Sequence, residues 1–534
     1  MTVARTHSVA LTGLDGHLVE VEADVSQNLP GFVIIGLPDA SLAEAKERVR
    51  VAANNSGCPL TDRKLTVNLS PASLPKQGSG FDLAIAMAGL AAAGSVPAAS
   101  IRDVVHLGEL RLDGRLRPLS GMLPAVVAAR KAGAKTVMVP IANRGEAELV
   151  PDIRVIAVST LREAAAWHGG QYPPAPAEPA APSDAAPVTP PTSASMRVAS
   201  ETAERQIKNM SAQLENDGDL GDIVGNEEAV SALIVAAAGG HNVLMVGPPG
   251  AGKTMLASRL IGILPDLSEA ESLESSCVHS LSGQSLEQGL IVRPPFESPH
   301  HSISIAALVG GGSAVIRPGA AARASGGVLF IDEVPEMSAT VLDSLRQSLE
   351  SRQIVIQRAR ATAVFPAKFQ LVMAANPCPC GNYGVRDGEC VCTPALRRRY
   401  LGRISGPIKD RIDIHLNVNR ITTAQLRVAD GAQRITSAQA RKRVERARAC
   451  SARRLADTPW RTNAEVPGSW LRERRQRLSL ETTVSVDRAL ERGLITMRGY
   501  DRVLRIAWTL CDLDAAASPT KSHVSQALYL RRGV

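Results

Sequence analysis

The sequence contains no long hydrophobic run, few aromatic residues and few cysteines. The best candidate for a membrane span, residues 83–93, is shorter than the about 18 residues that cross a bilayer, so it predicts a buried helix. The N-terminus has no basic segment followed by an apolar one, and we therefore expect no secretory signal, no membrane partner and a cytoplasmic protein. Eight cysteines among 534 residues are too few for a disulfide scaffold.

Phe, Trp and Tyr make up only 3% of the chain, which argues against a protein that binds single strands by base stacking. The charge is unevenly distributed. Residues 401–534 carry 26 Lys and Arg against 13 Asp and Glu, whereas the first 400 carry 34 against 39. A basic C-terminal region favours a polyanionic partner, either nucleotide or nucleic acid. Solvated helix faces rich in arginine would give the same count, so charge alone leaves both interpretations open.

Proline and alanine divide the chain. Residues 171–195 contain eight prolines and seven alanines, a composition typical of an extended linker that fills no core. We therefore expect four segments: an N-terminal domain (1–170), a linker (171–204), an α/β core (205–420) and a helical C-terminal domain (421–534).

The periodicity differs on the two sides of this linker. Short apolar runs at 31–38 and 64–70 predict strands, and the patterns at 41–57 and 81–94 predict helices, so the N-terminal domain is expected to be mixed α+β. A hairpin should turn at Asp113-Gly114. After the linker, strands alternate with helices, as in a parallel sheet.

The strongest motif is HNVLMVGPPGAGKTMLASRLIGIL at 241–264. An apolar strand runs into a glycine-rich loop and then directly into a helix, the arrangement in which backbone N–H groups and a helix N-terminus bind phosphates. Lys253 can reach the β- and γ-phosphates of ATP, and the Thr254 hydroxyl can ligate Mg²⁺. The nucleotide-binding residues predicted here are Gly247, Pro248, Pro249, Gly250, Ala251, Gly252, Lys253 and Thr254.

Two further strands end in polar residues. GGVLFIDEV (326–334) ends in Asp332, expected to hold Mg²⁺, and Glu333, expected to act as general base on the attacking water. The apolar run 369–375 is followed by Asn376, which could orient that water. Asn before Pro is also common in turns, so the Asn376 assignment depends on the other two motifs.

These motifs together resemble the AAA+ ATPases, and within them the magnesium-chelatase-like branch, over residues 205–534. The resemblance implies that Asn376 is sensor 1 and that Arg411, in SGPIKDRIDIHLNV (405–418), is the arginine finger. It also implies that Arg498, rather than Arg502, is the sensor 2 arginine. A finger acts on the nucleotide of a neighbouring subunit, so a homo-oligomer is expected. From the residues alone, each of these arginines could equally lie on the surface.

Four cysteines lie just beyond Asn376, in the insert 378–392. Cys378 and Cys380 form one pair, and Cys390 and Cys392 form a second. Two close pairs joined by a glycine-rich turn can ligate one tetrahedral Zn²⁺. Reduced structural thiols and a redox-responsive pair are the alternatives. A zinc ion here would brace the loop between Asn376 and the arginine finger. The adjacent His300 and His301 lack further donors in sequence, and we assign them no metal.

The segment 104–140 resembles the proteolytic domain of Lon, which has a ribosomal-S5-like fold, and this opens the alternative of an ATP-dependent protease. Lon requires a serine activated by a lysine. Leu123 occupies the lysine position, Gly80 the serine position, and Ser79 is one residue out of register. Lys76 lies near Ser79 in sequence, but we expect no peptidase activity.

The complete arrangement resembles the YifB/ComM family: a Lon-like N-terminal domain, a linker, a magnesium-chelatase-like AAA+ core and a C-terminal helical lid. Characterised members are hexameric, ATP-driven helicases that promote branch migration of DNA during natural transformation. The resemblance therefore implies ATP and Mg²⁺ as cofactors and branched or single-stranded DNA as partner. A chelatase motor and a protein-remodelling ATPase remain alternatives.

Overall fold

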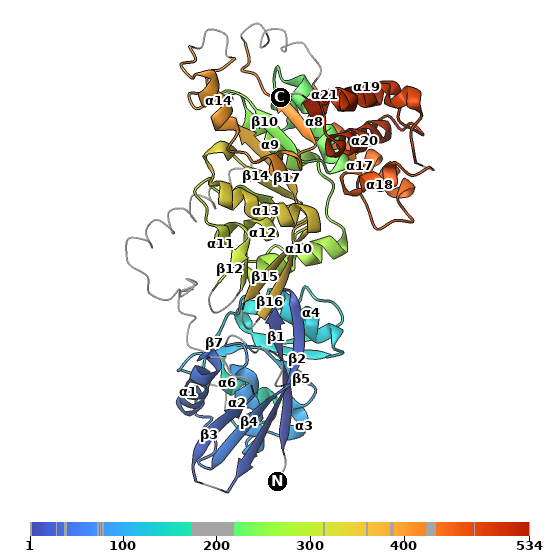
Figure 1. The fold of residues 1–534 in the computed structure, drawn as a ribbon. Coiled ribbons are helices and arrows are strands. Elements are labelled where there is room, and N and C mark those ends of the chain that lie inside the picture. Colours follow the sequence, from blue (N-terminus) through green and yellow to red (C-terminus); the bar gives the residue numbers. More distant parts are fainter. Residues whose placement is uncertain are drawn as a thin grey trace.

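The computed structural model describes residues 3–532 except 28, 37–39, 72–73, 75, 77–78, 173–217, 313–315, 359–360, 385–388, 423–424, 426–433 and 475. The N-terminal part lies at one end of the molecule, and the C-terminal helices lie beside the central part (Figure 1). The predicted linker falls outside the described residues apart from 171 and 172, so it stays a prediction.

The N-terminal part is built on a seven-stranded mixed sheet of order β3-β4-β2-β1-β5-β8-β9. The antiparallel pairs are β1–β2 and β2–β4, and the other pairs are parallel. The predicted strands at 31–38 and 64–70 are confirmed as β3 and β4. The strands are β1 (Ala4–Thr12), β2 (Asp15–Ser26), β3 (Gly31–Ile35), β4 (Lys64–Ser70), β5 (Val104–His106), β8 (Thr136–Pro140) and β9 (Arg154–Val158).

The N-terminal part contains both of the helices that were predicted, at 41–57 and 81–94, as α1 (Ala40–Asn55) and α2 (Asp82–Ala92). Its other helices are α3 (Ala98–Ile101), α4 (Met122–Lys131), α5 (Arg144–Ala147) and α6 (Leu161–Trp167), with the 3₁₀ turn η1 (Ile141–Asn143). Helix α2 is buried from Asp82 to Ala91, as an apolar helix without a polar face must be. The hairpin at Asp113-Gly114 is confirmed: β6 (Glu109–Leu110) pairs with β7 (Leu116–Arg117), and Gly114 has φ +82°.

The central part contains a five-stranded sheet of order β11-β14-β17-β10-β18, in which all pairs are parallel. Alternate residues of its inner strands join two different core clusters, one on each face. Burial on both faces explains their continuous apolar sequences. The strands are β10 (Val243–Val246), β11 (Phe296–Glu297), β14 (Val328–Ile331), β17 (Gln370–Ala375) and β18 (Ile414–Asn417).

Helices cover both faces of this sheet, and two small hairpins extend from it. The hairpins are β12 (Gly310–Gly311) with β13 (Arg317–Pro318) and β15 (Gln353–Arg358) with β16 (Ala361–Pro366). The helices and turns are η2 (Leu220–Asp222), α8 (Glu227–Gly239), α9 (Lys253–Ile263), α10 (Glu269–Leu281), α11 (Ile305–Leu308), α12 (Ala320–Arg323), η3 (Val334–Glu336), α13 (Ala339–Ser351), α14 (Pro394–Leu401) and α15 (Gly406–Lys409).

The N-terminal part packs directly on the central part. The β1–β2 turn contacts β16, where a Cβ on Gly13 would lie 3.1 Å from the carbonyl oxygen of Val364. The amide of Gly121 donates to the carbonyl of Ser280 at 3.0 Å, and the Ser280 hydroxyl donates to Glu146. Helix α10 is therefore shared between the two parts.

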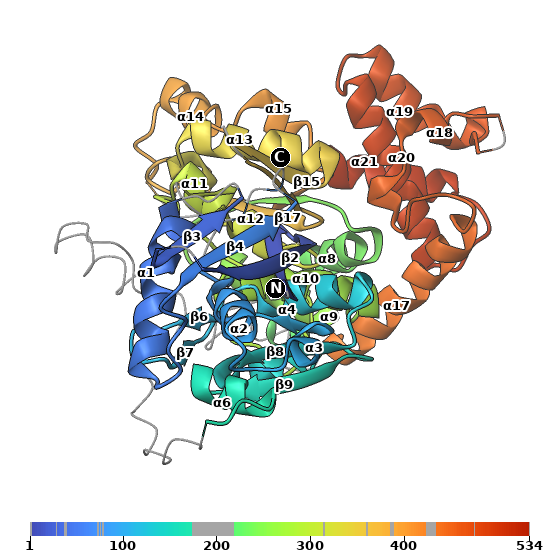
Figure 2. The same ribbon diagram turned by 90° about the horizontal axis from the view of Figure 1, so that it is seen from below.

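Among the described residues from 434 to 532, every regular element is helical, as predicted. The elements are α17 (Ser437–Arg454), η4 (Asn463–Glu465), α18 (Gly468–Leu471), α19 (Leu480–Glu491), α20 (Met497–Leu513) and α21 (Lys521–Arg532). They lie to one side of the sheet, and α17 follows the edge of the molecule (Figure 2). Within the described ranges, no helix is long and apolar enough to cross a membrane.

Two buried histidines in the N-terminal part link its stability to pH. Nε2 of His106 lies 2.9 Å from Nε2 of His168. Burial lowers the pKa of His168 to about 4. Burial, and then the proximity of His168, hold the pKa of His106 well below its ordinary value. Both rings are therefore neutral in the folded chain, whereas the unfolded chain takes up protons below about pH 6.5.

We expect the N-terminal part to lose stability as the pH falls from about 6.5 towards 4, by up to about 1.4 kcal/mol per pH unit for each histidine. The ring of Trp167 lies 4.6 Å from that of His168, so its fluorescence can follow urea unfolding at a series of pH values. His106→Gln cannot titrate and should weaken the dependence. An unfolding free energy that stays constant across this range would contradict the assignment.

Candidate nucleotide-binding site

Three strand ends meet at the carboxyl edge of the central sheet. Strand β17 lies between β10 and β14, so Asn376 stands between the loop after β10 and the carboxylates after β14. Because parallel strands end at the same edge, residues far apart in sequence come together here. The structure brings together all three motifs predicted from the sequence.

The glycine-rich loop after β10 has a conformation that other residues could not adopt. A Cβ on Gly247 would lie 2.2 Å from the carbonyl oxygen of Val418, at the end of β18. Gly252 has φ +89° and immediately precedes α9, in the left-handed region that favours glycine. The loop therefore turns tightly and directs the N-terminus of α9 towards the edge of the sheet.

Lys253 is buried at the centre of this loop. Its Nζ donates to the carbonyl of Gly247 at 2.7 Å, to that of Pro248 at 3.1 Å and to Oδ1 of Asn376 at 3.0 Å. Burial lowers the pKa of Lys253, while Asp332 and Glu333 oppose that change. A phosphate oxygen entering the loop would find this ammonium group already oriented.

The first residue of α9 that can ligate a metal faces the end of β14. The Thr254 hydroxyl donates to Oδ2 of Asp332 at 2.9 Å. A hydroxyl and a carboxylate oxygen in contact form part of the oxygen environment that Mg²⁺ prefers, with phosphates and water supplying the remaining ligands.

Glu333 follows in a strained conformation, with φ +49°. Such strain in a non-glycine residue costs about 1–3 kcal/mol and is concentrated at functional sites. The conformation turns the chain sharply after Asp332, and the Glu333 side chain remains half exposed.

Glu333 has a neighbour that the sequence did not indicate. Nδ1 of His301 lies 3.5 Å from a carboxylate oxygen of Glu333, and His301 follows β11 at the far end of the sheet. Because β11 is parallel to β14, the residues that follow it lie at the same edge as Asp332. In the sequence, the two adjacent histidines suggested only a possible metal site. The contact of His301 with Glu333 depends on the strand order, which no local pattern indicates.

The two other predicted arginines lie away from this loop. Arg411 precedes β18 at the opposite, amino edge of the sheet, where it is 8% exposed, contacts Glu350 and donates to the carbonyl of Pro407. Arg498, at the start of α20, lies 3.6 Å from Asp410. The structure brings these arginines close to each other, and not to the glycine-rich loop of the same chain.

Both arginines line a pocket of about 340 Å³ between the sheet and the C-terminal helices. Five arginines and five carboxylates contribute to its wall. These are Glu350, Arg352, Asp410, Arg411, Asp413, Glu465, Arg498, Asp501, Arg502 and Arg505.

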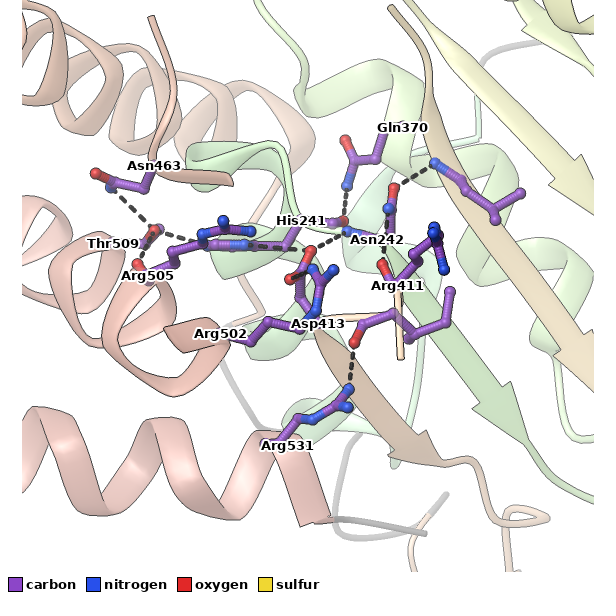
Figure 3. A network of polar contacts seen from close by, with 12 residues as sticks. His241, Asn242, Gln370, Arg411, Asp413, Asn463, Arg502, Arg505, Thr509 and Arg531 are labelled. Carbon is purple, nitrogen blue, oxygen red and sulfur yellow. Dashed lines mark hydrogen bonds and ion pairs between the residues drawn. The ribbon is translucent and has the colours of Figure 1, made fainter. Parts of the chain in front are cut away.

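Asp413 organises the polar network beside this pocket (Figure 3). It is buried, pairs with Arg502 of α20 and accepts from the amide of Asn242 at 3.0 Å. Burial alone would raise the pKa of Asp413, but Arg502 and His241 outweigh it and hold the pKa well below its usual range. Arg502 also donates to the carbonyl of Asp410 at 2.6 Å, so its guanidinium group is held by two partners within the fold.

The four cysteines of the insert converge. Their Sγ atoms all lie within 4.8 Å of one another, and within the described residues they form the one cluster of this kind. Cys378 is fully buried. A hydrogen bond from the backbone of Asn382 lowers the pKa of the Cys380 thiol to about 6. The insert also reaches the nucleotide loop, because a Cβ on Gly381 would lie 2.5 Å from Cδ of Pro249.

In the parallel sheet, a phosphate-binding loop follows β10 and carboxylates follow β14. A polar residue follows β17, which lies between these two strands. This arrangement defines an AAA+-type ATPase core. Three family models match the chain: "Magnesium chelatase, subunit ChlI" at 219–426, "Subunit ChlI of Mg-chelatase" at 21–143 and "Magnesium chelatase, subunit ChlI C-terminal" at 434–531.

Similar proteins match along the whole chain. Competence protein ComM of Haemophilus influenzae is 37% identical over 99% of this chain and 98% of its own length. YifB of Escherichia coli is 36% identical, with 99% and 97% covered. A protein of Mycobacterium tuberculosis is 45% identical, with 100% and 99% covered. The chain therefore belongs to the YifB/ComM family of magnesium-chelatase-like proteins.

Likeness to Lon is partial. Lon protease of Mycolicibacterium smegmatis is 28% identical over 151 residues, which are 27% of this chain and 19% of that protein. Nζ of Lys76 donates to the backbone carbonyls of Pro71 and Leu74, and the Ser79 hydroxyl donates to Glu109. Lys76 and Ser79 thus have separate partners and form no lysine–serine pair.

Asp413→Asn should destabilise the chain strongly, by about 3–5 kcal/mol, because it leaves the buried side of Arg502 without its charge partner. Urea unfolding followed by circular dichroism measures the change. Asp501→Asn is the matched control, since its partner Arg472 is 40% exposed and such a pair contributes at most about 1 kcal/mol. Equal losses in the two variants would contradict the central role of Asp413.

Proposed function

We propose that this protein is an ATP-hydrolysing ring motor that acts on DNA as a branch-migration helicase. The observation that carries the ATPase assignment is the convergence of Lys253, Thr254, Asp332 and Asn376 through direct hydrogen bonds. These residues follow three different strands, and the binding of a nucleotide phosphate with Mg²⁺ requires the three strand ends to lie side by side.

Each residue then has a defined task. Lys253 and the loop amides bind the β- and γ-phosphates of ATP. Thr254 and Asp332 would hold Mg²⁺, which supplies charge neutralisation at the phosphates. Glu333 accepts a proton from the attacking water, and Asn376 orients that water. His301 lies beside Glu333 and holds its carboxylate in place.

We infer that the active form is a hexameric ring. Arg411 and Arg498 share one pocket at the edge of the sheet that is opposite to the nucleotide loop. Arginines in this place can stabilise transition-state charge only on the nucleotide of another subunit. Two arginines that line one pocket with room for phosphate groups favour action on the nucleotide of a neighbouring subunit.

DNA is proposed as the substrate on two grounds. The relative from Haemophilus influenzae is named a competence protein, and the C-terminal helices carry an excess of arginine. A chelatase-like or protein-remodelling motor would use the same ATPase core, so the DNA dependence of hydrolysis decides among them.

We also propose that the four cysteines of the insert bind structural Zn²⁺, within the reducing cytoplasm. Four thiols are a complete ligand set for a closed structural site. Sγ of Cys378 lies 3.3 Å from that of Cys380 and 3.8 Å from that of Cys390, a spacing close to that of a tetrahedral sulfur set. The ion would fix the insert against Pro249 of the nucleotide loop.

Lys253→Ala and Glu333→Gln should each lower ATP hydrolysis by about 100-fold or more, through lost phosphate binding and lost proton transfer respectively. Hydrolysis is measured with and without synthetic three- and four-strand branched DNA. Wild-type hydrolysis should rise with branched DNA. Lys368→Ala, which removes an exposed lysine paired with Glu274, is the control and should behave as wild type.

The outcomes separate the proposals. Hydrolysis that both variants abolish but that no DNA stimulates would support the ATPase and overturn the DNA motor. Hydrolysis that survives Lys253→Ala would overturn the site itself.

The purified protein should contain one zinc per chain, measured by elemental analysis, and Cys378→Ser should lose it because three thiols no longer close the tetrahedral site. Cys450→Ser changes a cysteine outside the cluster and should keep the full amount. Absence of zinc from protein purified without chelators, or its retention in Cys378→Ser, would refute the site.

A further inference from the structure

Helix α17 has an unusual excess of positive charge. It contains seven Lys and Arg and a single acidic residue, Glu445. Three of the cations have partners outside α17, whereas Arg453 contacts Ala449 and Cys450 of its own helix. Arg441 pairs with Glu445 and Asp266, Arg448 donates to the carbonyl of Ala237 at 3.0 and 2.8 Å, and Arg454 pairs with Asp512.

The other four cations form one outer stripe: Lys442, Arg443, Arg446 and Arg453. All four are exposed, and among the described residues none has a carboxylate within ion-pair distance. Glu445 and Asp266, the acidic groups beside them, are engaged by Arg441. The stripe is therefore a surface of uncompensated charge.

The geometry of the helix turns this stripe away from the protein. The buried residues of α17 are Ala440, Val444, Ala447 and Ser451, which fall in one narrow arc at about 100° per residue. On the same wheel the outer stripe spans an arc of about 100°, and its centre lies about 120° from that of the buried arc, with Arg443 on the flank nearest the buried side. Figure 2 shows α17 at the edge of the molecule, and the four side chains of the stripe are all exposed.

We propose that the outer stripe of α17 binds the phosphate backbone of the DNA on which the motor acts, independently of base sequence. This inference rests on the proposed function and adds the place of contact. Exposed cations spaced along a rigid helix neutralise phosphates and release counterions, which makes binding depend on salt. The described stripe contains no aromatic side chain, so it offers charge without base stacking.

The test compares two pairs of substitutions with the same charge change. Lys442→Gln with Arg446→Gln removes half of the stripe. Arg488→Gln with Arg492→Gln removes two exposed arginines at the end of α19. Binding of fluorescein-labelled duplex DNA and of its single strand to the full chain is followed by anisotropy over a series of KCl concentrations, together with basal ATP hydrolysis and sedimentation.

The stripe variant should bind more weakly, with a slope of log K against log[KCl] that is shallower by about 1.8 for duplex and about 1.4 for single strands. The α19 variant should keep the wild-type slope, and both should keep basal hydrolysis. An unchanged slope in the stripe variant, or an equal change in the α19 variant, overturns the proposal. So does a smaller oligomer with an unchanged slope, which would make the stripe a subunit contact. Wild-type protein that binds no DNA would instead refute the proposed function.

Discussion

The central sheet is buried on both faces, and this constraint determines where chemistry can occur. The buried apolar side chains of its strands belong to one core cluster or the other, so unpaired polar groups emerge mainly where strands begin or end. All five strands are parallel, and each edge therefore collects groups of one kind. The carboxyl edge gathers the phosphate loop, the carboxylates and Asn376, whereas the amino edge gathers Arg411, Asp413 and their partners.

Asp413 connects the amino edge to the C-terminal helices. A carboxylate that is buried at the start of β18 requires a charge partner, and Arg502 of α20 supplies it. The same helix begins with Arg498, so the ion pair that holds α20 on the sheet also sets the distance between Arg498 and Arg411. Any movement of the C-terminal helices relative to the sheet would have to carry this ion pair along or break it. The arginine pocket and the nucleotide loop thus lie at opposite edges of the same sheet.

The sequence was informative where one local pattern determines both structure and chemistry. The glycine-rich loop with its flanking strand and helix, the apolar strand before Asp332 and the arginine-rich helices could all be predicted from neighbouring residues. Strand order could not, because it depends on packing between distant segments. For this reason His301 was missed beside Glu333, and the shared pocket of Arg411 and Arg498 was not foreseen. Arg502, considered as a sensor from its motif, is engaged by Asp413, a partner that no local pattern indicates.

The contact between the N-terminal part and α10 gives the segment that is similar to Lon a structural role. Leu123, which the resemblance to Lon matches to a catalytic lysine, is fully buried in a core cluster that also contains Cys277 of α10. Its amide donates to Glu146 at 2.9 Å, and Glu146 also accepts from Ser280 of α10. A lysine at this position would bring a charge into an apolar contact without a carboxylate left to pair with it, since Glu146 is already occupied. The segment that is similar to Lon thus packs against α10 of the ATPase core.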